Sequence, residues 1–210
     1  MIFEHFMVGM LQTNCYLVGD PESRQAVVID PGGDSGHIAR RIEEHNLQLA
    51  AILNTHAHFD HIMDAWALKK ILGGEIYLHD KDQPLIHDRT VGLGAIPRPG
   101  AQAMKTDIDR SLHEGDVLEF GLIHLKVLET PGHSPGHVSF YFAEAGVLFV
   151  GDTLFAGSIG RTDFPGGSYD QLIRSVREKI FPLPGETLVY PGHGPETTVE
   201  QEKKTNPFFR

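Results

Sequence analysis

Four residues that can ligate a metal ion lie within positions 56–61 of the segment Thr55-His56-Ala57-His58-Phe59-Asp60-His61. The apolar residues 49–54 before it predict a short buried strand, and residues 62–72 after it predict a helix that ends at Gly73-Gly74. The segment is therefore a turn whose side chains a rigid strand end can hold in fixed positions. Imidazole and carboxylate together suit zinc and its first-row neighbours, whereas calcium and magnesium prefer oxygen ligands almost alone. This turn predicts a transition-metal site.

The turn can serve two ions, because its backbone need not follow helix or strand periodicity. His56 and His58 can reach one ion, and Asp60 and His61 can reach a second ion beside it. The alternative is a turn of four solvated polar residues. Solvation requires no such concentration of histidine, the usual imidazole ligand of metals, so we favour the metal site.

The length and charge of the chain narrow the classes of protein to which it can belong. A chain of 210 residues is an ordinary size for one α/β domain, so we expect a single domain over residues 1–210. The formal net charge of −10 argues against a nucleic-acid partner, because neutralising phosphates requires clustered Lys and Arg. The sequence leaves the oligomeric state open.

The N-terminal residues and the single cysteine bear on the cellular compartment. Residues 1–6 lack a basic segment followed by a long apolar run, so we expect no signal peptide. The sequence also lacks an apolar stretch of about 18 residues, which argues against a membrane span. Cys15 cannot form an internal disulfide, and we expect it to be buried as a small apolar residue. Together these features predict a reducing, cytoplasmic setting.

Strand and helix signals follow one another along the chain. Asp34 or Ser35 can cap a helix that ends near Asn46, and Ser168 can form a capping box with Gln171 at the start of another helix. An irregular stretch from about residue 84 to residue 109 is rich in Gly and Pro, and we expect it to border the active-site cleft. The predicted strands cover residues 14–18, 25–30, 75–79, 117–120, 122–129, 138–142, 147–150 and 187–190, and a short polar helix covers residues 198–205.

Three later segments repeat the pattern of a strand that runs into a turn with a ligand-capable residue. They are residues 128–133 with His133, residues 149–152 with Asp152 and residues 189–193 with His193. A glycine beside each ligand permits a sharp turn, so the side chains can converge from separate strands. With the first cluster they supply five His and two Asp, which exceeds what one tetrahedral zinc requires. The set suits two metals that share a bridging carboxylate and a bridging hydroxide, and it predicts a dinuclear site.

The ordered motifs of these segments resemble those of the metallo-β-lactamase fold superfamily. They are Thr55-His56-Ala57-His58-Phe59-Asp60-His61, Thr130-Pro131-Gly132-His133-Ser134, Gly151-Asp152-Thr153-Leu154-Phe155 and Tyr190-Pro191-Gly192-His193-Gly194. The resemblance covers nearly the whole chain and implies an α/β fold, a four-layer αββα sandwich of two mixed β-sheets with the metal site at one edge. It also implies the metal ligands, which are His56, His58 and His133 for the first metal, Asp60, His61 and His193 for the second, and Asp152 as the bridge.

Within that superfamily the chain is most similar to the glyoxalase II-like hydrolases, through residues 151–155 and 160–168. Those members hydrolyse thioesters, notably S-lactoylglutathione. The resemblance therefore implies a small-molecule thioester substrate and two divalent metals, zinc first, with iron or manganese as the alternatives. The implied reaction is attack on the thioester carbonyl by a metal-bridging hydroxide, which Asp60 orients while it ligates the second metal. Glyoxalase II itself has a larger C-terminal helical region with basic residues for glutathione, and we expect this chain, which stops soon after His193, to lack it.

Further residues are candidates for supporting or substrate-binding roles. His79 and His137 can support the ligands, although a structural role suits His79 equally well. Arg161 is the expected substrate-binding residue, through a carboxylate of the substrate, although it can equally pair with Asp163 to fix its own loop. The remaining histidines lack a converging motif and are expected to be structural or solvated, namely His5, His37, His45, His87, His113 and His124.

Two other functions stay open. A mononuclear-iron persulfide dioxygenase resembles the chain through residues 160–164, and in that enzyme class His56, His133 and Asp152 would form an iron site. A non-catalytic metal-binding module would bind zinc tightly without turnover. We favour the thioester hydrolase because residues 152–155 resemble the hydrolases more closely. β-Lactamase activity is less favoured, since we expect no export signal.

Overall fold

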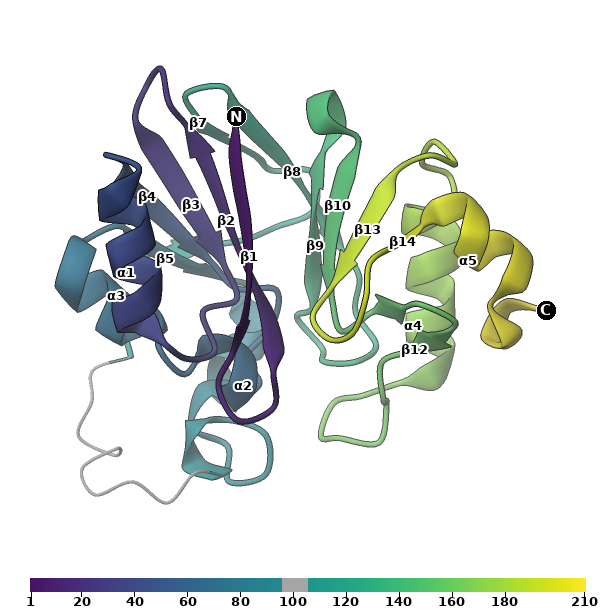
Figure 1. Cartoon of the computed structure of the whole chain (residues 1–210). Coiled ribbons are helices and arrows are strands. Elements are labelled where there is room, and N and C mark those ends of the chain that lie inside the picture. The colour runs from purple at the N-terminus through teal and green to yellow at the C-terminus, as the bar shows by residue number, and fades with distance from the viewer. Residues whose placement is uncertain (96–105) are drawn as a thin grey trace.

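Two β-sheets face each other in the computed structural model, and helices cover the outer face of each sheet (Figure 1). The structure describes residues 1–95 and 106–210. Both sheets mix parallel and antiparallel pairs, so the α/β class and the four-layer αββα sandwich are confirmed. Among the helices described, none is both long and apolar enough to cross a membrane.

The first sheet has the strand order β1-β2-β3-β4-β5-β6. Its first three strands form an antiparallel meander, and the later strands pair in parallel because helices or long connections return the chain between them. The strands are β1 Ile2–Val8, β2 Thr13–Asp20, β3 Gln25–Ile29, β4 Gln48–Leu53, β5 Glu75–Leu78 and β6 Arg110–Ser111.

The second sheet has the strand order β14-β13-β10-β9-β8-β7. Four of the predicted strands form two hairpins, the antiparallel pairs β7 with β8 and β9 with β10. Because β10 is parallel to β13 and separated from β8 by one antiparallel strand, β8, β10 and β13 run in one direction and end at one edge. The strands are β7 Val117–Phe120, β8 Ile123–Glu129, β9 Val138–Phe142, β10 Val147–Gly151, β13 Leu188–Pro191 and β14 Thr197–Thr198, with a separate pair β11 Leu154–Phe155 and β12 Ser158–Ile159.

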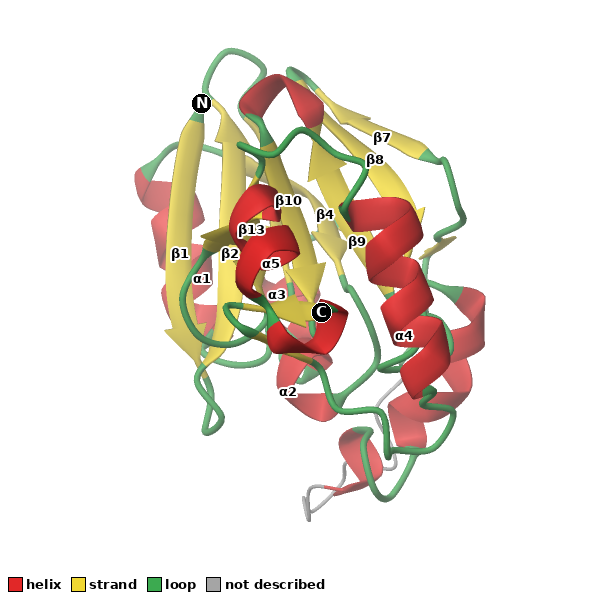
Figure 2. Cartoon of the chain, turned by 90° about the vertical axis from the view of Figure 1, so that its right-hand side faces the viewer, coloured by secondary structure: helices red, strands yellow, loops and turns green. Residues whose placement is uncertain are grey.

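Helices α1, α3, α4 and α5 pack on the outer faces of the sheets, whereas α2 lies below the sheets (Figure 2). Helices α1 and α3 cover the first sheet, where Ile38 and Ile42, one turn apart on α1, are fully buried. Helices α4 and α5 cover the second sheet, and a π-helical turn, Val176–Ile180, continues α4. The α-helices are α1 Ser35–Glu44, α2 Phe59–Ile62, α3 Ala65–Leu72, α4 Tyr169–Ser175 and α5 Val199–Thr205, and 3-10 helices cover Asp80–His87, Leu93–Ala95, Ala143–Ala145 and Pro207–Phe209.

An apolar layer fills the space between the two sheets. Phe140 and Phe149 of the second sheet belong to one buried cluster with Ile29 and Leu53 of the first sheet. Burying a side chain of this size contributes roughly 1.5–3 kcal/mol, so the layer holds the two sheets together. The strand ends at its margin are thereby fixed relative to one another.

The helix predicted over residues 62–72 is wrong in its extent, because the chain breaks it into α2 and α3 at Met63 and Asp64. The N–H of Asp64 donates to the carbonyl of Pro31 at 3.0 Å, and its carboxylate accepts the N–H of Ser35 at 3.0 Å. These contacts join Asp64 to the segment after β3, which is distant in the sequence. Helix propensity depends on neighbouring residues, so it could not predict this break.

The predicted side-chain cap of α1 is also wrong. Asp34 stands at the N-cap position in a left-handed conformation, and the described contacts include no capping bond from its side chain. Its carboxylate accepts the N–H of Gly9 at 3.0 Å instead. At α4 half of the predicted capping box is present, since the Ser168 hydroxyl accepts the N–H of Gln171 at 3.4 Å, whereas the Ser168 N–H donates to the carbonyl of Gly132 at 2.8 Å.

Sequence reasoning missed the short strands and the first strand. β1 is an edge strand that exposes Phe3 and Met7, so its apolar residues do not alternate cleanly between a buried and a solvated face. β14 follows the strand that we expected to be the last one. In the irregular stretch from residue 84 to residue 109, Thr90 and Val91 line the site cavity as expected, and residues 96–105 lie outside the described residues.

Candidate metal centre

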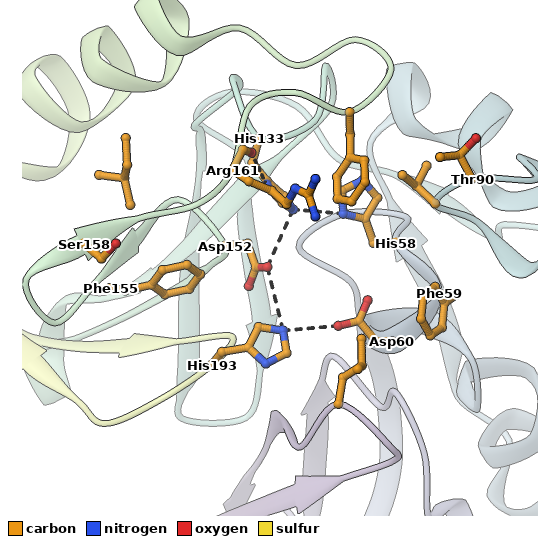
Figure 3. Close-up of a pocket in the computed structure, with 14 residues that line it drawn as sticks. His58, Phe59, Asp60, Thr90, His133, Asp152, Phe155, Ser158, Arg161 and His193 are labelled. Atoms are coloured by element: carbon orange, nitrogen blue, oxygen red, sulfur yellow. Dashed lines mark hydrogen bonds and ion pairs between the residues drawn. The ribbon is translucent and has the colours of Figure 1, made fainter. Parts of the chain in front are cut away.

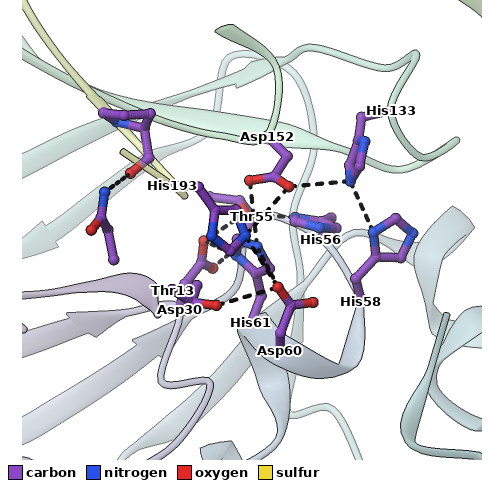
Figure 4. Close-up of polar contacts among 12 residues, drawn as sticks. Thr13, Asp30, Thr55, His56, His58, Asp60, His61, His133, Asp152 and His193 are labelled. Carbon is purple, nitrogen blue, oxygen red and sulfur yellow. Dashed lines mark hydrogen bonds and ion pairs between the residues drawn. The ribbon is translucent and has the colours of Figure 1, made fainter. Parts of the chain in front are cut away.

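The seven predicted ligands lie together where strands of both sheets end (Figure 4). From the first sheet, β4 leads into the turn with His56 and His58, and α2 then carries Asp60 and His61. From the second sheet, the strands β8, β10 and β13 lead into turns with His133, Asp152 and His193 respectively. The strand-to-turn pattern in the sequence thus predicted correctly which segments meet.

His56, His58 and His133 form the first cluster. Their ring nitrogens can all lie within 4.8 Å of one another, and Nε2 of His133 is 2.8 Å from Nδ1 of His58. Nδ1 of His133 donates to the carbonyl of Arg161 at 2.7 Å, so Nε2 keeps its lone pair. Two imidazole nitrogens that face each other in this way can coordinate one cation between them.

Asp60, His61 and His193 form the second cluster. Oδ2 of Asp60 lies 3.1 Å from Nε2 of His193 and 3.6 Å from Nε2 of His61. Asp152 lies between the two clusters, with Oδ1 3.4 Å from Nε2 of His61 and Oδ2 3.6 Å from Nε2 of His133. Oδ2 also lies 3.8 Å from Nε2 of His193, so the carboxylate faces both clusters, which is the arrangement that a bridging ligand needs.

Unpartnered buried atoms show that this residue set fits metal ions. In the described part of the chain, the buried atoms without a hydrogen-bond partner include Nε2 of His56, Nε2 of His61 and Oδ1 of Asp152. Leaving such an atom unsatisfied costs about 1–3 kcal/mol. Their gathering in one place is explained if cations bind there, and imidazole with carboxylate is the ligand chemistry of zinc, iron and manganese.

The electrostatics of the cluster favour a divalent cation. Burial lowers the pKa of His58 to about 2, and the neighbouring His133 adds to the effect, so the His58 ring is neutral. Burial would raise the pKa of Asp60, but His61 and His193 outweigh it and hold that pKa well below its usual range. Burial would likewise lower the pKa of His61, but the carboxylates led by Asp152 raise it to about 10. A cation can replace this proton.

Two glycines allow the ligands to approach one another. A Cβ atom at Gly192 would lie 2.3 Å from Oδ1 of Asp152 and 2.6 Å from Cε1 of His61. A Cβ atom at Gly160 would lie 1.7 Å from the carbonyl oxygen of Asp152. Any larger residue at either position would displace Asp152.

Asp30 is a supporting residue that sequence reasoning missed. Its Oδ2 accepts the hydroxyl of Thr55 at 2.7 Å and lies 2.9 Å from Nδ1 of His61. The Thr55 hydroxyl in turn lies 3.0 Å from Nδ1 of His56. The available signal was that Asp30 ends a strand immediately before Pro31, as the later ligands follow strands. Metal-ligating histidines usually donate their second ring nitrogen to such a partner.

His137 lies behind the centre, as its position in the motif region suggested. Its Nε2 accepts the backbone N–H of Asp152 at 3.1 Å, and its Nδ1 lies 3.0 Å from the hydroxyl of Thr130. Burial holds its pKa well below the usual range. The neutral ring therefore supports the backbone of Asp152.

A cavity of about 470 Å³ opens directly onto the ligands (Figure 3). His58, Asp60, His133, Asp152 and His193 contribute to its lining. The other lining residues are mainly apolar, namely Leu11, Phe59, Val91, Phe155, Ile159 and Phe164, together with Thr90, Ser158 and Arg161. A small organic molecule bound in this mainly apolar cavity can thus contact the metal ligands.

Arg161 lies at this cavity and also forms the alternative contact that the sequence allowed. Its Nε and Nη2 donate to the two carboxylate oxygens of Asp163 at 2.7 and 2.6 Å, and its guanidinium carbon is 3.9 Å from the ring centre of Phe164. The pair is exposed, so it orients the guanidinium more than it stabilises the fold.

His79 is directed to other partners. Its Nδ1 accepts the N–H of Lys81 at 3.0 Å, so its Nε2 carries the proton and donates to Glu129 at 3.1 Å. His113 and Glu129 lie close enough to His79 for a metal site, but this proton occupies the nitrogen that a metal would need. The contacts favour the structural role for His79.

The chain matches known proteins over almost its whole length. The model of the metallo-beta-lactamase superfamily matches residues 8–193. The chain is 40% identical over 210 residues to hydroxyacylglutathione hydrolase GloC of Haemophilus influenzae, which covers 100% of this chain and 98% of that protein. It is also 40% identical over 210 residues to the probable metallo-hydrolase YqgX of Bacillus subtilis, with the same coverage of 100% and 98%.

Solved structures share the fold. The BLEG-1 B3 metallo-beta-lactamase has a TM-score of 0.89 and 40% identity, over 99% of both chains. TTHA1623 in a di-iron-bound form has a TM-score of 0.83 and 41% identity, over 98% of this chain and 99% of that one. ETHE1 from Myxococcus xanthus has a TM-score of 0.80 and 31% identity, over 99% and 84%. With its histidine and aspartate clusters at the edge of two facing sheets, the chain belongs to the metallo-β-lactamase superfamily and is a metallo-hydrolase of that family.

Proposed function

We propose that this metallo-hydrolase cleaves thioesters, with S-lactoylglutathione as the first substrate to test. The observation that carries the proposal is the position of the ligands, which open onto a mainly apolar cavity of about 470 Å³. The full-length similarity to hydroxyacylglutathione hydrolase GloC supports the same reaction class. We further propose a dinuclear centre with zinc, in which His56, His58 and His133 hold one ion, Asp60, His61 and His193 hold the other, and Asp152 bridges them.

In this reaction the residues of the site would have distinct roles. When bound, the metals supply a hydroxide near neutral pH, because coordination lowers the pKa of water to about 7, and they polarise the thioester carbonyl. Asp60 is fixed for its orienting role, since Oδ2 accepts the hydroxyl of Thr13 at 3.3 Å and faces His193 at 3.1 Å. The apolar side chains of Leu11 and Phe155 offer a surface for the carbon chain of the substrate. A thiolate leaves without the strong protonation that an amine requires, since a free thiol has a pKa of about 8.5.

The test is one purified, untagged preparation on which metal content and thiol release from S-lactoylglutathione are measured together. We expect about two metals per chain, loss of thiol release after chelation, and recovery on adding Zn²⁺. A protein with two metals that releases no thiol from any thioester would contradict the proposal.

Two competing reactions belong in the same experiment. Persulfide dioxygenase is the second candidate, on the resemblance of residues 160–164 and on the similarity to ETHE1. It predicts one iron per chain and oxygen consumption with glutathione persulfide. The similarity to the BLEG-1 B3 metallo-beta-lactamase calls for a chromogenic β-lactam as a third substrate. Turnover of either without thioester cleavage would replace the proposed function.

A further inference from the structure

Asp82 is a buried carboxylate that lies outside the ligand motifs. It stands in the 3-10 helix Asp80–His87 after β5, and it has no exposed surface. Removing a carboxylate from water costs several kcal/mol even after relaxation, and hydrogen bonds must compensate for that cost. The partners of Asp82 therefore indicate what the buried charge is for.

Three hydrogen-bond donors point at this carboxylate. Oδ2 accepts the backbone N–H of Ala57 at 3.0 Å and the hydroxyl of Ser134 at 2.7 Å. Oδ1 accepts the backbone N–H of Gly136 at 2.5 Å. Because a backbone N–H can only donate, both oxygens must act as acceptors, which is the behaviour of an ionised carboxylate.

The donors belong to two turns that carry ligands of the first cluster. Ala57 separates His56 from His58 in the turn after β4 of the first sheet. Ser134 immediately follows His133 in the turn after β8 of the second sheet. The carboxylate thus connects the ligand turn of one sheet to the ligand turn of the other.

The second turn is shaped to admit the carboxylate. A Cβ atom at Gly136 would lie 2.8 Å from Oδ1 of Asp82 and 2.7 Å from its backbone nitrogen, so only glycine allows this approach. Burial raises the pKa of Asp82, and its hydrogen bonds, led by that from Ser134, oppose the rise.

We propose that Asp82 is a positioning residue for the first metal, because its carboxylate fixes the separation between the turn of His58 and the turn of His133. The facing ring nitrogens of these two histidines are 2.8 Å apart, and they come from different sheets. A metal ion holds its nitrogen ligands at about 2.0–2.1 Å, so a small shift between the turns removes one ligand. The proposal rests on the prediction that His56, His58 and His133 bind one ion.

The first variant is Asp82→Asn in the full chain. An amide NH₂ replaces one carboxylate oxygen, so the N–H of either Ala57 or Gly136 then faces another donor, while side-chain volume is kept. The metal-free protein is titrated with Zn²⁺ in competition with a chromophoric chelator. We expect one of its two zinc affinities to fall about 10- to 100-fold, as is usual when a partner behind a metal site is lost, and the other to stay unchanged.

Asp20→Asn is the matched control. Asp20 is 1% exposed and, like Asp82, accepts a serine hydroxyl and backbone N–H groups, in its case from Ser23, Glu22 and Leu122. It lies at the end of β2 remote from Thr13, whose hydroxyl contacts Asp60. If Asp82 is only structural, both variants will lower the melting temperature of the metal-free protein and leave both zinc affinities unchanged.

Ser134→Ala removes a single one of the three donors and keeps the test decisive if Asp82→Asn does not fold. We expect a smaller fall in the same zinc affinity, with the Co²⁺ absorption spectrum of that site altered. Wild-type affinities and spectrum in whichever of these variants folds would overturn the positioning role. A wild-type protein that binds no Zn²⁺ would overturn the metal assignment itself, and thereby the proposal as well.

Discussion

The carboxylate of Asp30 accepts a hydrogen bond from Nδ1 of His61 at 2.9 Å. Because a carboxylate cannot donate, Nδ1 carries a proton, and Nε2, which faces Asp60 and Asp152, is the nitrogen at which a cation can replace the second ring proton. Through the hydroxyl of Thr55 the same group also faces the His56 ring. One buried acid therefore orients a ligand in each cluster.

Asp30→Asn is expected to weaken metal binding. The introduced NH₂ faces a donor in either orientation, because Oδ1 of Asp30 accepts the backbone N–H of Thr55 at 2.7 Å and Oδ2 accepts Nδ1 of His61 at 2.9 Å. Either the turn that carries His56 shifts, or the ring proton of His61 moves to Nε2, where a ligand needs its lone pair. We expect a loss of zinc affinity of about 10- to 100-fold, measured by competition with a chelator. Asp34→Asn, a change in the same loop that leaves His61 paired, is the control and is expected to bind zinc like the wild type. Equal affinities for all three proteins would contradict the role of Asp30.

Asp152→Ala is expected to abolish most thioester hydrolysis and to lower metal content toward one ion per chain, because its carboxylate faces both clusters. His58→Ala should also abolish most hydrolysis, through loss of a ligand of the first metal. Metal analysis and thiol release on the same samples check both variants. Near-native turnover by metal-replete Asp152→Ala would contradict the assignment of Asp152 as the bridging ligand.

Arg161→Met is expected to raise KM for S-lactoylglutathione by up to about tenfold with a smaller change in kcat, if its guanidinium meets a carboxylate of the substrate. Asp163→Asn separates this role from loop fixation, since it removes the ion pair and keeps the arginine. Initial-rate kinetics on both variants decide the question. Equal increases in KM would show that Arg161 acts by holding its loop.

Glu4→Gln is expected to destabilise the protein in a pH-dependent way. The hydrogen bond from Arg41 outweighs the effect of burial and, with that of His45, lowers the pKa of Glu4 from 4.5 to about 2. A lowered pKa stabilises the folded state above pH 4.5, and this stabilisation is lost as the pH falls toward 2. The melting temperature of the metal-free variant should therefore be below that of the wild type at pH 7, with a smaller gap at pH 3.

The control for this change is Glu44→Gln, which removes the more exposed partner of Arg41. We expect a smaller effect on the melting temperature at pH 7, because solvent screens the exposed pair. A Glu4→Gln gap of the same size at pH 7 and pH 3 would show that the Glu4 carboxylate contributes through packing alone.

The sequence predicted which segments meet, because that information is local, whereas the sandwich was expected from the resemblance to the superfamily. His56 and His58 are near neighbours in one turn, and each later ligand follows its own strand. The supporting acids were not predictable in this way. Asp30 reaches His61 across 31 positions, and Asp82 reaches Ser134 across 52, so only the folded pairing of strands brings them together.

The same limit explains the errors in the helices. Apolar periodicity predicted one helix over residues 62–72. In the structure Asp64 is hydrogen-bonded to Pro31 and Ser35, which lie in another connecting segment of the first sheet. Arg161 shows the reverse case, since proximity in sequence offered pairing with Asp163 as one of two alternatives, and that pairing is present. Contacts between residues close in sequence could be predicted, whereas contacts between separate connecting segments of the sheet could not.

The ligand set begins at residue 56 and ends at residue 193, and it draws on both sheets. Until β13 has joined the second sheet, an ion cannot meet the full set, so the complete site exists only in the folded chain. By mass action, an ion that binds only this form adds its binding energy to the free energy of unfolding. The concentration of metal is then expected to determine how fast proteases degrade the protein. At low metal concentration the protein would be lost together with its activity.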